Sequence, residues 1–514
     1  MRLSTLIDAL PESLGPRIWV NRDSNSDPVI RGMGYDSRQV SPGDLFVALR
    51  GAVSDGHDFI ERALALGAAA VLVEEAPAPE QLGSAVAIVV EDTRQAMAPL
   101  AQHFFGHPSK ELSLIGITGT NGKTSTAYLV ESILKAAPRR AALIGTVEIR
   151  YADQHIPAVN TTPESLDLQR TLRSMCTQNI QNVVMEVSSH GLELGRVRGC
   201  QFDIAAFTNL TQDHLDFHGS MEAYREAKAR LFSDFLTPEG AAVVNIDDPA
   251  SAVIMEAAKL SRARILRCSR EDRNEPDVLL ESAHVTINGT QAQIRIQDQT
   301  LTFEIPLLGD FNLENVLVAC GIGCALEVPS ESIIEGIRSC PQVPGRMEVI
   351  RSSKSDAPTV LIDYAHTPDA IEKLLSAVRP LSEGRVLTVF GCGGDRDRAK
   401  RPLMAHAVAK QTDLAIATSD NPRTEDPEQI LQDVEGGLQR LNRATPTNLP
   451  DRGGYTVLPD RREAIRCAID QARPEDTVVI AGKGHEDYQI IGTQKLPFDD
   501  REEARRALGE GDLP

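Results

Sequence analysis

A glycine-rich stretch in the first third of the chain carries the residue types of a phosphate-binding loop. Residues 116–125 read GITGTNGKTS, and Lys123 and Thr124 directly follow Gly122. In such a loop, backbone N–H groups cradle phosphates, the lysine contacts the terminal phosphates and the threonine hydroxyl can ligate Mg²⁺. The spacing departs from the usual G-x-x-x-x-G-K-[ST], because Ile117 stands where the first glycine belongs. A structural glycine turn is the alternative, but it gives no reason for Lys-Thr at a helix start.

Three further residue types downstream could serve a phosphate site. Glu186 ends the apolar run VVMEV, and an acid at the carboxyl end of a neighbouring parallel strand lies where a metal ligand belongs; it could instead cap a helix. His214 and His218 have a spacing found in zinc sites, but no third soft ligand accompanies them. Lys228 sits on the following helix, where a solvated surface lysine is the alternative.

Polar segments also follow strands in the last third of the chain. They lie at residues 363–371, 391–404, 419–427 and 482–489. Because the carboxyl ends of parallel strands share one edge of a sheet, these loops together predict a ligand crevice, although each alone could be an ordinary loop. Asn312 and Asn315 stand at a helix start and could be simple caps.

Length and composition bound the class of protein. The 514 residues suggest about three domains. A formal net charge of −20 argues against nonspecific nucleic-acid binding, which needs a basic surface. The absence of a run of eighteen apolar residues predicts no membrane insertion, and the N-terminus lacks a signal-peptide core, so we expect a cytoplasmic protein. Eight scattered cysteines without a C-x-x-C pair predict free thiols.

The periodicity of apolar residues predicts an α/β protein with three domains. A small α/β N-terminal domain (1–110) has expected strands at 43–51, 68–75 and 86–92, and a helix at 93–105. A central P-loop-type domain (111–340) has a mainly parallel sheet, with strands at 112–118, 141–147, 182–187, 203–210 and 241–247, helices at 124–137 and 311–327, and an antiparallel annex at 278–307. A C-terminal Rossmann-like doubly wound sheet (341–514) has strands at 359–365, 385–394, 413–420 and 477–484.

The motifs resemble those of the Mur ligase family, in the family's order, from about residue 35 to 490. They are GTNGKT at 119–124, MEVSSHGL at 185–192, NLTQDHLDFHG at 209–219, FNLEN at 311–315, GRME at 345–348, DYAHTPD at 363–369 and GCGGDRD at 391–397. The phosphate loop of this family reads T-G-T-N-G-K-[ST], which accounts for the unusual glycine spacing. Within the family, the chain is most similar to the ligases that add the third residue of the peptidoglycan stem peptide.

The resemblance implies a reaction and its small-molecule partners. ATP, with Mg²⁺, would phosphorylate the γ-carboxylate of UDP-N-acetylmuramoyl-L-alanyl-D-glutamate, and the amine of the incoming amino acid would displace phosphate from the acyl phosphate. Catalysis would rest on positioning and charge neutralisation. The resemblance implies no nucleic-acid partner, and we expect a monomer.

The resemblance also implies roles for residues that match the family's motifs. ATP contacts would be Gly119, Thr120, Asn121, Gly122, Lys123, Thr124, Ser125, Asn312, Arg346 and Asp363. Catalytic residues would be Lys123, Glu186, His214 and Lys228, and the metal site would comprise Thr124, Glu186, His214 and Lys228 as a carbamate, which requires a depressed lysine pKa. The sugar-nucleotide contacts would be Tyr35, Ser37, Ala52, Val53, Ser54, Asn160, Thr161, Thr162, Ser188, Leu194 and Arg196. Leu194 departs from the family's frequent glutamine, so the resemblance does not carry one substrate hydrogen bond over to this position.

The stretch Asp420-Asn421-Pro422-Arg423 indicates which amino acid the enzyme would add. In the resemblance it marks enzymes that use meso-2,6-diaminopimelate, with Arg396, Gly482 and Glu486 as further contacts. A guanidinium can bind the far carboxylate of diaminopimelate bidentately, whereas lysine has no such group. The alternatives are a lysine-adding ligase of the same fold, a folylpolyglutamate synthetase, and a P-loop switch or ATP-dependent scaffold. The last of these leaves the C-terminal loops without a purpose.

Overall fold

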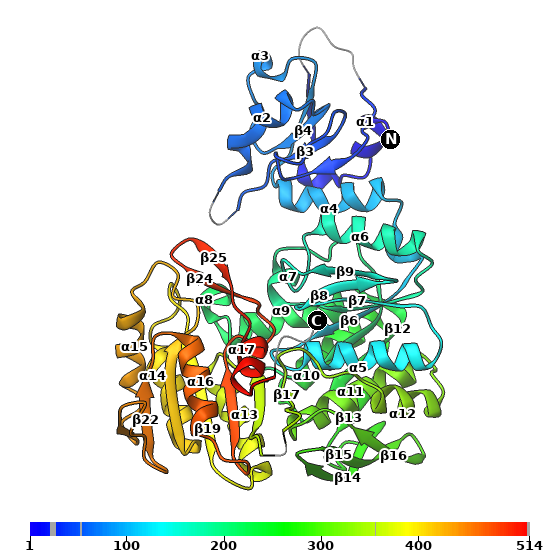
Figure 1. Ribbon diagram of the computed structural model, residues 1–514. Coiled ribbons are helices and arrows are strands. Elements are labelled where there is room, and N and C mark those ends of the chain that lie inside the picture. Colours follow the sequence, from blue (N-terminus) through cyan, green and yellow to red (C-terminus); the bar gives the residue numbers. More distant parts are fainter. Residues whose placement is uncertain (21–26, 52–53, 355, 511–514) are drawn as a thin grey trace.

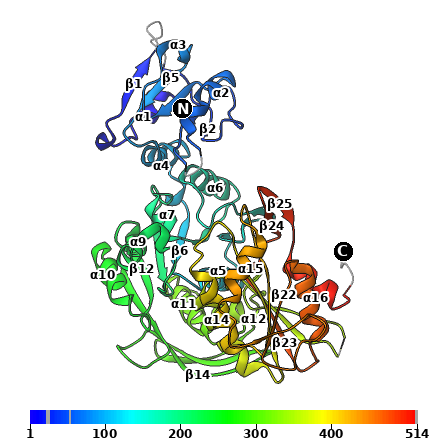
Figure 2. The ribbon, with the colours of Figure 1, turned by 90° about the vertical axis from the view of Figure 1, so that its left-hand side faces the viewer.

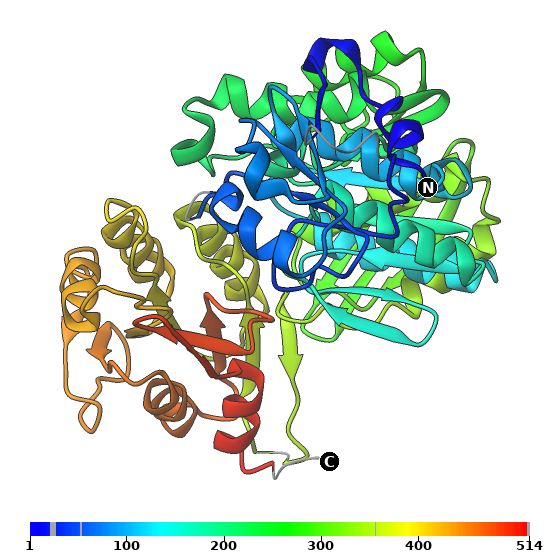
Figure 3. The same cartoon turned by 90° about the horizontal axis from the view of Figure 1, so that it is seen from above.

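The computed structural model describes residues 1–20, 27–51, 54–354 and 356–510. Figure 1 shows three domains, with the N-terminal domain above the central one and the C-terminal domain beside it. From above, in Figure 3, the N-terminal domain lies over the central domain and the C-terminal domain lies to one side. The three-domain α/β fold is therefore confirmed, while the bounds 1–110, 111–340 and 341–514 stay predictions.

The N-terminal domain is a five-stranded sheet in the order β1-β5-β4-β3-β2, with only β1 antiparallel to its neighbour. All residues of β3 are apolar and buried, and successive side chains pack on opposite faces of the sheet, where α1 and α4 cover one face and α2 and α3 the other. Helix α4 also packs against α6 of the central domain (Figure 2). The elements are α1 (Leu3–Ile7), η1 (Glu12–Leu14), β1 (Arg17–Val20), β2 (Met33–Gly34), β3 (Leu45–Val47), η2 (Gly56–Phe59), α2 (Ile60–Ala65), β4 (Ala70–Val73), α3 (Pro79–Leu82), β5 (Val86–Val89) and α4 (Thr93–Phe104).

The central domain is an eleven-stranded sheet in the order β16-β15-β14-β13-β12-β11-β6-β10-β7-β8-β9. Its middle strands are parallel and buried on both faces, by α5, α11 and α12 on one side and by α6, α9 and α10 on the other. The elements are η3 (Pro108–Lys110), β6 (Ser113–Thr118), α5 (Lys123–Ala136), β7 (Ala141–Ile144), β8 (Glu148–Tyr151), β9 (Gln154–Pro157), α6 (Ser165–Thr177), β10 (Asn182–Glu186), α7 (Ser189–Glu193), β11 (Phe202–Phe207), α8 (Leu215–His218), α9 (Met221–Ser233), β12 (Leu236–Asn245), α10 (Ser251–Ser261), β13 (Arg264–Ser269), β14 (Val278–Thr286), β15 (Gly289–Ile296), β16 (Gln299–Ile305), α11 (Phe311–Ala325) and α12 (Ser330–Arg338).

The C-terminal domain is a seven-stranded sheet in the order β17-β18-β23-β19-β20-β22-β21, with a separate hairpin formed by β24 and β25. Helices α13, α14 and α15 pack on one face, and α16 and α17 on the other. The elements are β17 (Glu348–Ile350), β18 (Thr359–Asp363), α13 (Pro368–Val378), η4 (Arg379–Leu381), β19 (Val386–Cys392), α14 (Lys400–Gln411), β20 (Leu414–Ser419), α15 (Pro427–Glu435), β21 (Asn442–Arg443), β22 (Gly454–Val457), α16 (Arg461–Gln471), β23 (Thr477–Ala481), β24 (Tyr488–Ile491), β25 (Gln494–Pro497) and α17 (Asp500–Ala507).

Two features differ from the expectation or extend it. The antiparallel annex expected at 278–307 is present as β14–β16, and it extends the central sheet because β14 also pairs in parallel with β13. The hairpin β8–β9 was not expected at all; its strands have four residues each and β9 is exposed along its length. All eight cysteines are free, as expected. Within the described ranges, no helix combines the length and apolar character needed to cross a membrane.

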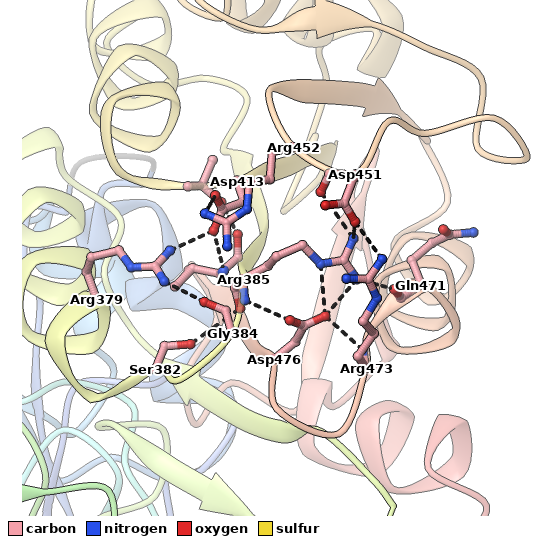
Figure 4. A network of polar contacts seen from close by, with 12 residues as sticks. Arg379, Ser382, Gly384, Arg385, Asp413, Asp451, Arg452, Gln471, Arg473 and Asp476 are labelled. Atoms are coloured by element: carbon pink, nitrogen blue, oxygen red, sulfur yellow. Dashed lines mark hydrogen bonds and ion pairs between the residues drawn. The ribbon is translucent and has the colours of Figure 1, made fainter.

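A buried ion-pair network ties the amino ends of two C-terminal strands together (Figure 4). Arg385, just before β19, donates to Asp476, just before β23, through its backbone N–H at 2.7 Å and through Nη2 at 2.6 Å. Their side chains are 6% and 1% exposed. Burial alone would raise the pKa of Asp476, but its hydrogen bonds from Arg385 and from the N–H of Arg473 outweigh this and hold the pKa below its ordinary value. The ion pair therefore stabilises the domain fully at pH values above the ordinary aspartate pKa. This stabilisation is lost as the pH falls through the lowered pKa of Asp476.

We predict that Arg385→Met destabilises the C-terminal domain, because it leaves a buried carboxylate without its partner. The free energy of opening at β19 and β23 should fall by about 3–5 kcal/mol, measured by hydrogen exchange of their amides. Arg466→Met is the matched control, since the pair Arg466–Asp470 is 76% and 58% exposed and should contribute almost nothing. A loss at Arg385 no larger than at Arg466 would contradict the prediction.

Candidate active site

The glycine-rich loop lies between β6 and α5, and its geometry requires glycine at two positions. At Gly119, with φ +153°, a Cβ would come within 1.9 Å of the Thr208 hydroxyl oxygen, and at Gly122, with φ +85°, within 2.1 Å of the Asn315 amide oxygen. The loop is thus pressed against its neighbours while α5 begins at Lys123. The first N–H groups of a helix have no intrahelical acceptor, so this loop and helix start can receive an anion.

Two lysines converge on the carbonyl oxygen of Gly119. Lys123 Nζ donates to it at 2.8 Å and Lys228 Nζ at 2.9 Å. Lys228 is only 1% exposed, and it lies over the ring of Tyr224 at 4.3 Å. Burial holds the pKa of Lys228 well below its ordinary value, and the charge of Lys123 lowers it further. The reading of Lys228 as a solvated surface lysine is therefore wrong.

Glu186 ends β10, the strand that pairs with β6, and its carboxylate is 1% exposed. Thr124 Oγ1 donates to it at 3.0 Å, and Thr146 donates through its N–H at 2.8 Å and its hydroxyl at 2.9 Å. Ser188, not Glu186, caps the next helix. The arrangement brings a carboxylate and a hydroxyl together at the start of α5, and oxygen donors of this kind suit Mg²⁺.

His214 lies at the start of the short helix α8, with a left-handed φ of 52°. Its Nε2 is 3.4 Å from Asp213 Oδ2, and its ring stands edge-on to that of His190 at 4.7 Å. Burial lowers the pKa of His214 to about 4; Asp213 opposes this, while His190, Lys123 and Lys228 add to it. His218 contacts Ser189 instead, through Nε2 at 3.0 Å. No cluster of three His, Cys, Asp or Glu ligands occurs in the described part of the chain, so nothing there supports the zinc reading.

The two asparagines of α11 connect to the glycine-rich loop and are not simple caps. The amide of Asn315 donates to Asn312 Oδ1 at 2.7 Å, and Asn312 donates to the Leu308 carbonyl at 2.6 Å. Both asparagines are buried. Asn315 Oδ1 accepts from Thr126, one turn into α5, at 3.4 Å. The pair therefore fixes the helix start and the position of Gly122.

Residues proposed for the sugar nucleotide cluster next to Glu186. Thr162 Oγ1 donates to the Glu186 carbonyl at 3.0 Å and accepts the N–H of Ser188 at 2.9 Å. Arg196 donates to the Thr162 carbonyl at 3.1 Å and pairs with Glu164 at 3.1 Å. Thr161 contacts Thr146 through their hydroxyls at 3.0 Å. Asn160 is exposed, and Leu194 is partly exposed at the end of α7.

The N-terminal domain contributes a separate group of candidates. The Tyr35 hydroxyl donates to Asp167 of α6, and this hydrogen bond connects the N-terminal domain to the central domain. Ser37, two residues after Tyr35, is buried. Ser54 is exposed and its carbonyl accepts from Gly51 at 2.9 Å. Ala52 and Val53 lie outside the described residues.

Four C-terminal loops follow β18, β23, β19 and β20, which are consecutive in the sheet. Asp363 ends β18, where burial raises its pKa and the N–H groups of Met347 and Ala365 bind it at 2.8 Å each. Arg346 stacks over the ring of Tyr364 at 4.4 Å. The candidate nucleotide contacts Asp363 and Arg346 thus lie together.

Arg423 has a left-handed φ of 53°, and its Nη1 donates to the Gly394 carbonyl at 2.7 Å. The N–H of Gly394 in turn donates to the Asn421 carbonyl at 2.9 Å. Asp395 accepts from the Thr424 hydroxyl at 2.9 Å, so the loops after β19 and β20 are joined on both sides of Arg423. Arg423 is partly exposed, and none of the ion pairs among the described residues involves it. The guanidinium is held near the loop junction and remains able to bind an acid.

The remaining amino-acid-site candidates differ in environment. Arg396 is exposed, and Gly482 has a φ of +120°, which favours glycine. Glu486 accepts from Asn421 Nδ2 at 3.0 Å, and Oδ1 of the partly buried Asp420 lies 3.3 Å from Lys483 Nζ. Pro422 is buried between Asn421 and Arg423.

Sequence reasoning missed three polar residues that the fold brings to this region. Thr146 binds Glu186, Lys483 lies between Asp420 and Glu486, and Asp213 faces both domains because Lys400 of α14 lies 3.8 Å away. Lys483 had a signal in the sequence, since it follows a strand within GKGHEDY. For Thr146 and Asp213 the contacts depend on strands and domains that are distant in sequence.

The chain is similar to known proteins over its whole length. Residues 117–323 match the Mur ligase middle domain, residues 345–484 the Mur ligase glutamate ligase domain, and residues 29–105 the Mur ligase family catalytic domain. The UDP-N-acetylmuramoyl-L-alanyl-D-glutamate–2,6-diaminopimelate ligase of Geobacillus thermodenitrificans is 45% identical over 516 residues, covering 99% of this chain and 100% of that protein. A solved structure of a ligase with the same name has a TM-score of 0.67 at 35% identity, covering 100% of both chains.

A more distant structure shares the fold. The MurF ligase of Thermotoga maritima in complex with ADP has a TM-score of 0.65 at 18% identity, covering 94% of this chain and 99% of that one.

We predict that His214 stays neutral down to a pH of about 4 in the free protein. Asp213→Asn should lower its pKa further, because it removes the negative charge that favours the imidazolium. NMR titration of ¹³C-histidine-labelled protein measures both values, with His214→Gln to assign the signal. Titration of His214 near the ordinary value of about 6.5 would contradict the burial argument.

Proposed function

The chain belongs to the Mur ligase family, and we propose that it is the member that joins meso-2,6-diaminopimelate to UDP-N-acetylmuramoyl-L-alanyl-D-glutamate with consumption of ATP, in peptidoglycan precursor synthesis. Full-length similarity to ligases with this name supports the reaction. The observation that carries the choice of amino acid is the guanidinium of Arg423, held by Gly394 at the carboxyl edge of the C-terminal sheet.

In the proposed first step, the γ-phosphoryl group of ATP passes to the γ-carboxylate of the D-glutamate, leaving ADP and an acyl phosphate. Lys123 and the first turn of α5 would bind the phosphates, where the helix dipole and free N–H groups favour negative charge. Thr162, Ser188 and Arg196 would orient the muramoyl-dipeptide, because Thr162 binds the Glu186 carbonyl and both Ser188 and Arg196 bind Thr162, next to this loop. These groups act by holding two reactants together.

The residues around Glu186 fit a magnesium ion. Thr124 and Glu186 provide oxygen donors of the type that Mg²⁺ prefers, and they lie 3.0 Å apart at the phosphate loop. A bound Mg²⁺ would neutralise charge on the phosphates. Lys228 would support it as a carbamate, since the lowered pKa leaves a neutral amine that can add carbon dioxide and become an anion. Burial also lowers the pKa of His214 and keeps its ring neutral, and His214 would lie close to the magnesium ion.

In the proposed second step, the amine of diaminopimelate attacks the acyl carbon, phosphate leaves, and an amide bond forms. The two kinds of charge in the C-terminal loops match the far end of this amino acid, which carries an ammonium and a carboxylate. Glu486 would bind the ammonium and Arg423 the carboxylate, with Arg396, Gly482 and Asn421 around them. Lysine would leave Arg423 unpaired next to an ammonium, at a cost of about 2–3 kcal/mol.

The rival functions predict different behaviour. A lysine-adding ligase would not benefit from Arg423, and a folylpolyglutamate synthetase has no use for diaminopimelate. A P-loop switch or scaffold would show no amino-acid-dependent ATP turnover. The four C-terminal loops and the buried Glu186 favour the ligase.

We predict that phosphate release requires both the UDP-muramoyl-dipeptide and diaminopimelate, and that lysine is a poor substitute. Arg423→Ala should lower kcat/KM for diaminopimelate roughly a hundredfold while ATP binding changes little, because a charge-assisted contact to the distal carboxylate is lost. Arg398→Ala in the neighbouring loop is the control, since Arg398 is exposed and pairs with Asp433. Equal losses for diaminopimelate and ATP would refute the assignment of Arg423.

We predict that Lys228 takes up carbon dioxide. In ¹³C-bicarbonate the wild-type protein should show a carbamate signal by ¹³C NMR that Lys228→Ala lacks and Lys259→Ala keeps, because Lys259 is an exposed lysine on α10. Lys228→Ala should also lower kcat by about a hundredfold or more. A carbamate signal that survives in Lys228→Ala would place the modification elsewhere.

A further inference from the structure

Lys483 lies in the loop between β23 and β24, and its side chain is completely buried. The ammonium donates to the Tyr488 carbonyl at 2.7 Å and to Asn421 Oδ1 at 3.1 Å. It also lies 3.3 Å from Asp420 Oδ1 and 3.4 Å from Glu486 Oε2. One buried cation thus contacts both the loop after β20 and the start of the hairpin.

The partners of Lys483 are also linked to one another. Asn421 donates through Nδ2 to Glu486 Oε2 at 3.0 Å and accepts the N–H of Ile490 at 2.9 Å. Gln489 donates to the Asp420 carbonyl at 2.7 Å. The N–H of Arg423 donates to the Ile490 carbonyl at 3.0 Å. The contacts of Lys483 therefore reach the backbone that carries Arg423.

The charges around Lys483 do not cancel. Burial alone would raise the pKa of Asp420, but the charges of Lys483 and Arg461 outweigh it and hold the pKa below its ordinary value. Arg461 is itself paired with Asp500, both fully buried. Two carboxylates, Asp420 and Glu486, therefore share one ammonium, and their side chains are similarly exposed, at 14% and 18%. One negative charge remains for a cation that enters beside Glu486.

We propose that Lys483 is a positioning residue for the incoming amino acid, which it serves by holding Asn421 and Glu486 together and by leaving one unneutralised carboxylate for the distal ammonium. This role rests on the proposed function. Lys483 would not touch the substrate. It would set the distance between the group that binds the ammonium, Glu486, and the group that binds the carboxylate, Arg423, so that a molecule with both charges is preferred over lysine.

The test compares two buried cations in the same domain of the full-length enzyme. Lys483→Met removes the ammonium at the carboxyl edge of the sheet, and Arg385→Met removes a buried cation at the opposite, amino edge (Figure 4). Phosphate release gives KM for diaminopimelate, ATP and the sugar nucleotide, and kcat/KM for diaminopimelate relative to lysine. For Lys483→Met we expect KM for diaminopimelate to rise at least about tenfold, KM for ATP to change less than about twofold, and the preference over lysine to fall about tenfold.

Three results would overturn the proposal: an unchanged KM for diaminopimelate in Lys483→Met, equal increases in all three KM values, or the same pattern in Arg385→Met. If Lys483→Met is not recovered folded, Lys483→Gln decides by the same ratios, because glutamine keeps a donor for Asn421 or Tyr488 and loses the charge. A wild-type enzyme without diaminopimelate-dependent phosphate release would refute the proposed function as well. A normal wild type with a normal Lys483→Met would refute this inference alone.

Discussion

Parallel strands of one sheet all end at the same edge, and this constraint places almost every polar group of the candidate site. In the central sheet it brings the loop after β6 and Glu186 at the end of β10 together. In the C-terminal sheet it aligns the loops after β18, β23, β19 and β20. Asp213 and Lys400 show that the two edges meet, because this ion pair at 3.8 Å joins a loop of one domain to a helix of the other. The proposed transfer from ATP to substrate to amino acid depends on that meeting.

Two buried lysines illustrate how the environment decides what a residue can do. Lys228 has a carbonyl oxygen and an aromatic ring beside it, with a second lysine on the same carbonyl, and its pKa is depressed. A neutral amine of this kind is reactive. Lys483 has two carboxylates within 3.4 Å and donates to two further oxygen atoms, the Tyr488 carbonyl and Asn421 Oδ1. The first environment suits covalent modification, and the second suits the positioning of neighbouring groups.

The sequence predicted the fold class, the glycine-rich loop and the strands that carry the candidate residues, because long apolar runs and glycine spacing are local signals. The local pattern left Lys228 open to reading as a solvated lysine, whereas the family resemblance required a depressed pKa there, and the burial of Lys228 agrees with that requirement. The contacts of Thr146 and Lys483 join segments 40 and 62 residues apart, so no local pattern reports them. The hairpin β8–β9 was missed for another reason, because each strand has only four residues and β9 is exposed along its length, so the apolar pattern is too short to mark a strand.

The central claim is that Arg423 recognises a second acid group on the incoming amino acid. A crystal structure of the protein with ADP, the UDP-muramoyl-dipeptide and diaminopimelate tests it most directly. The account predicts that the distal carboxylate lies within hydrogen-bond distance of the Arg423 guanidinium, with the distal ammonium on Glu486. A complex in which the Arg423 side chain extends into solvent, while the distal carboxylate binds elsewhere, would contradict the account.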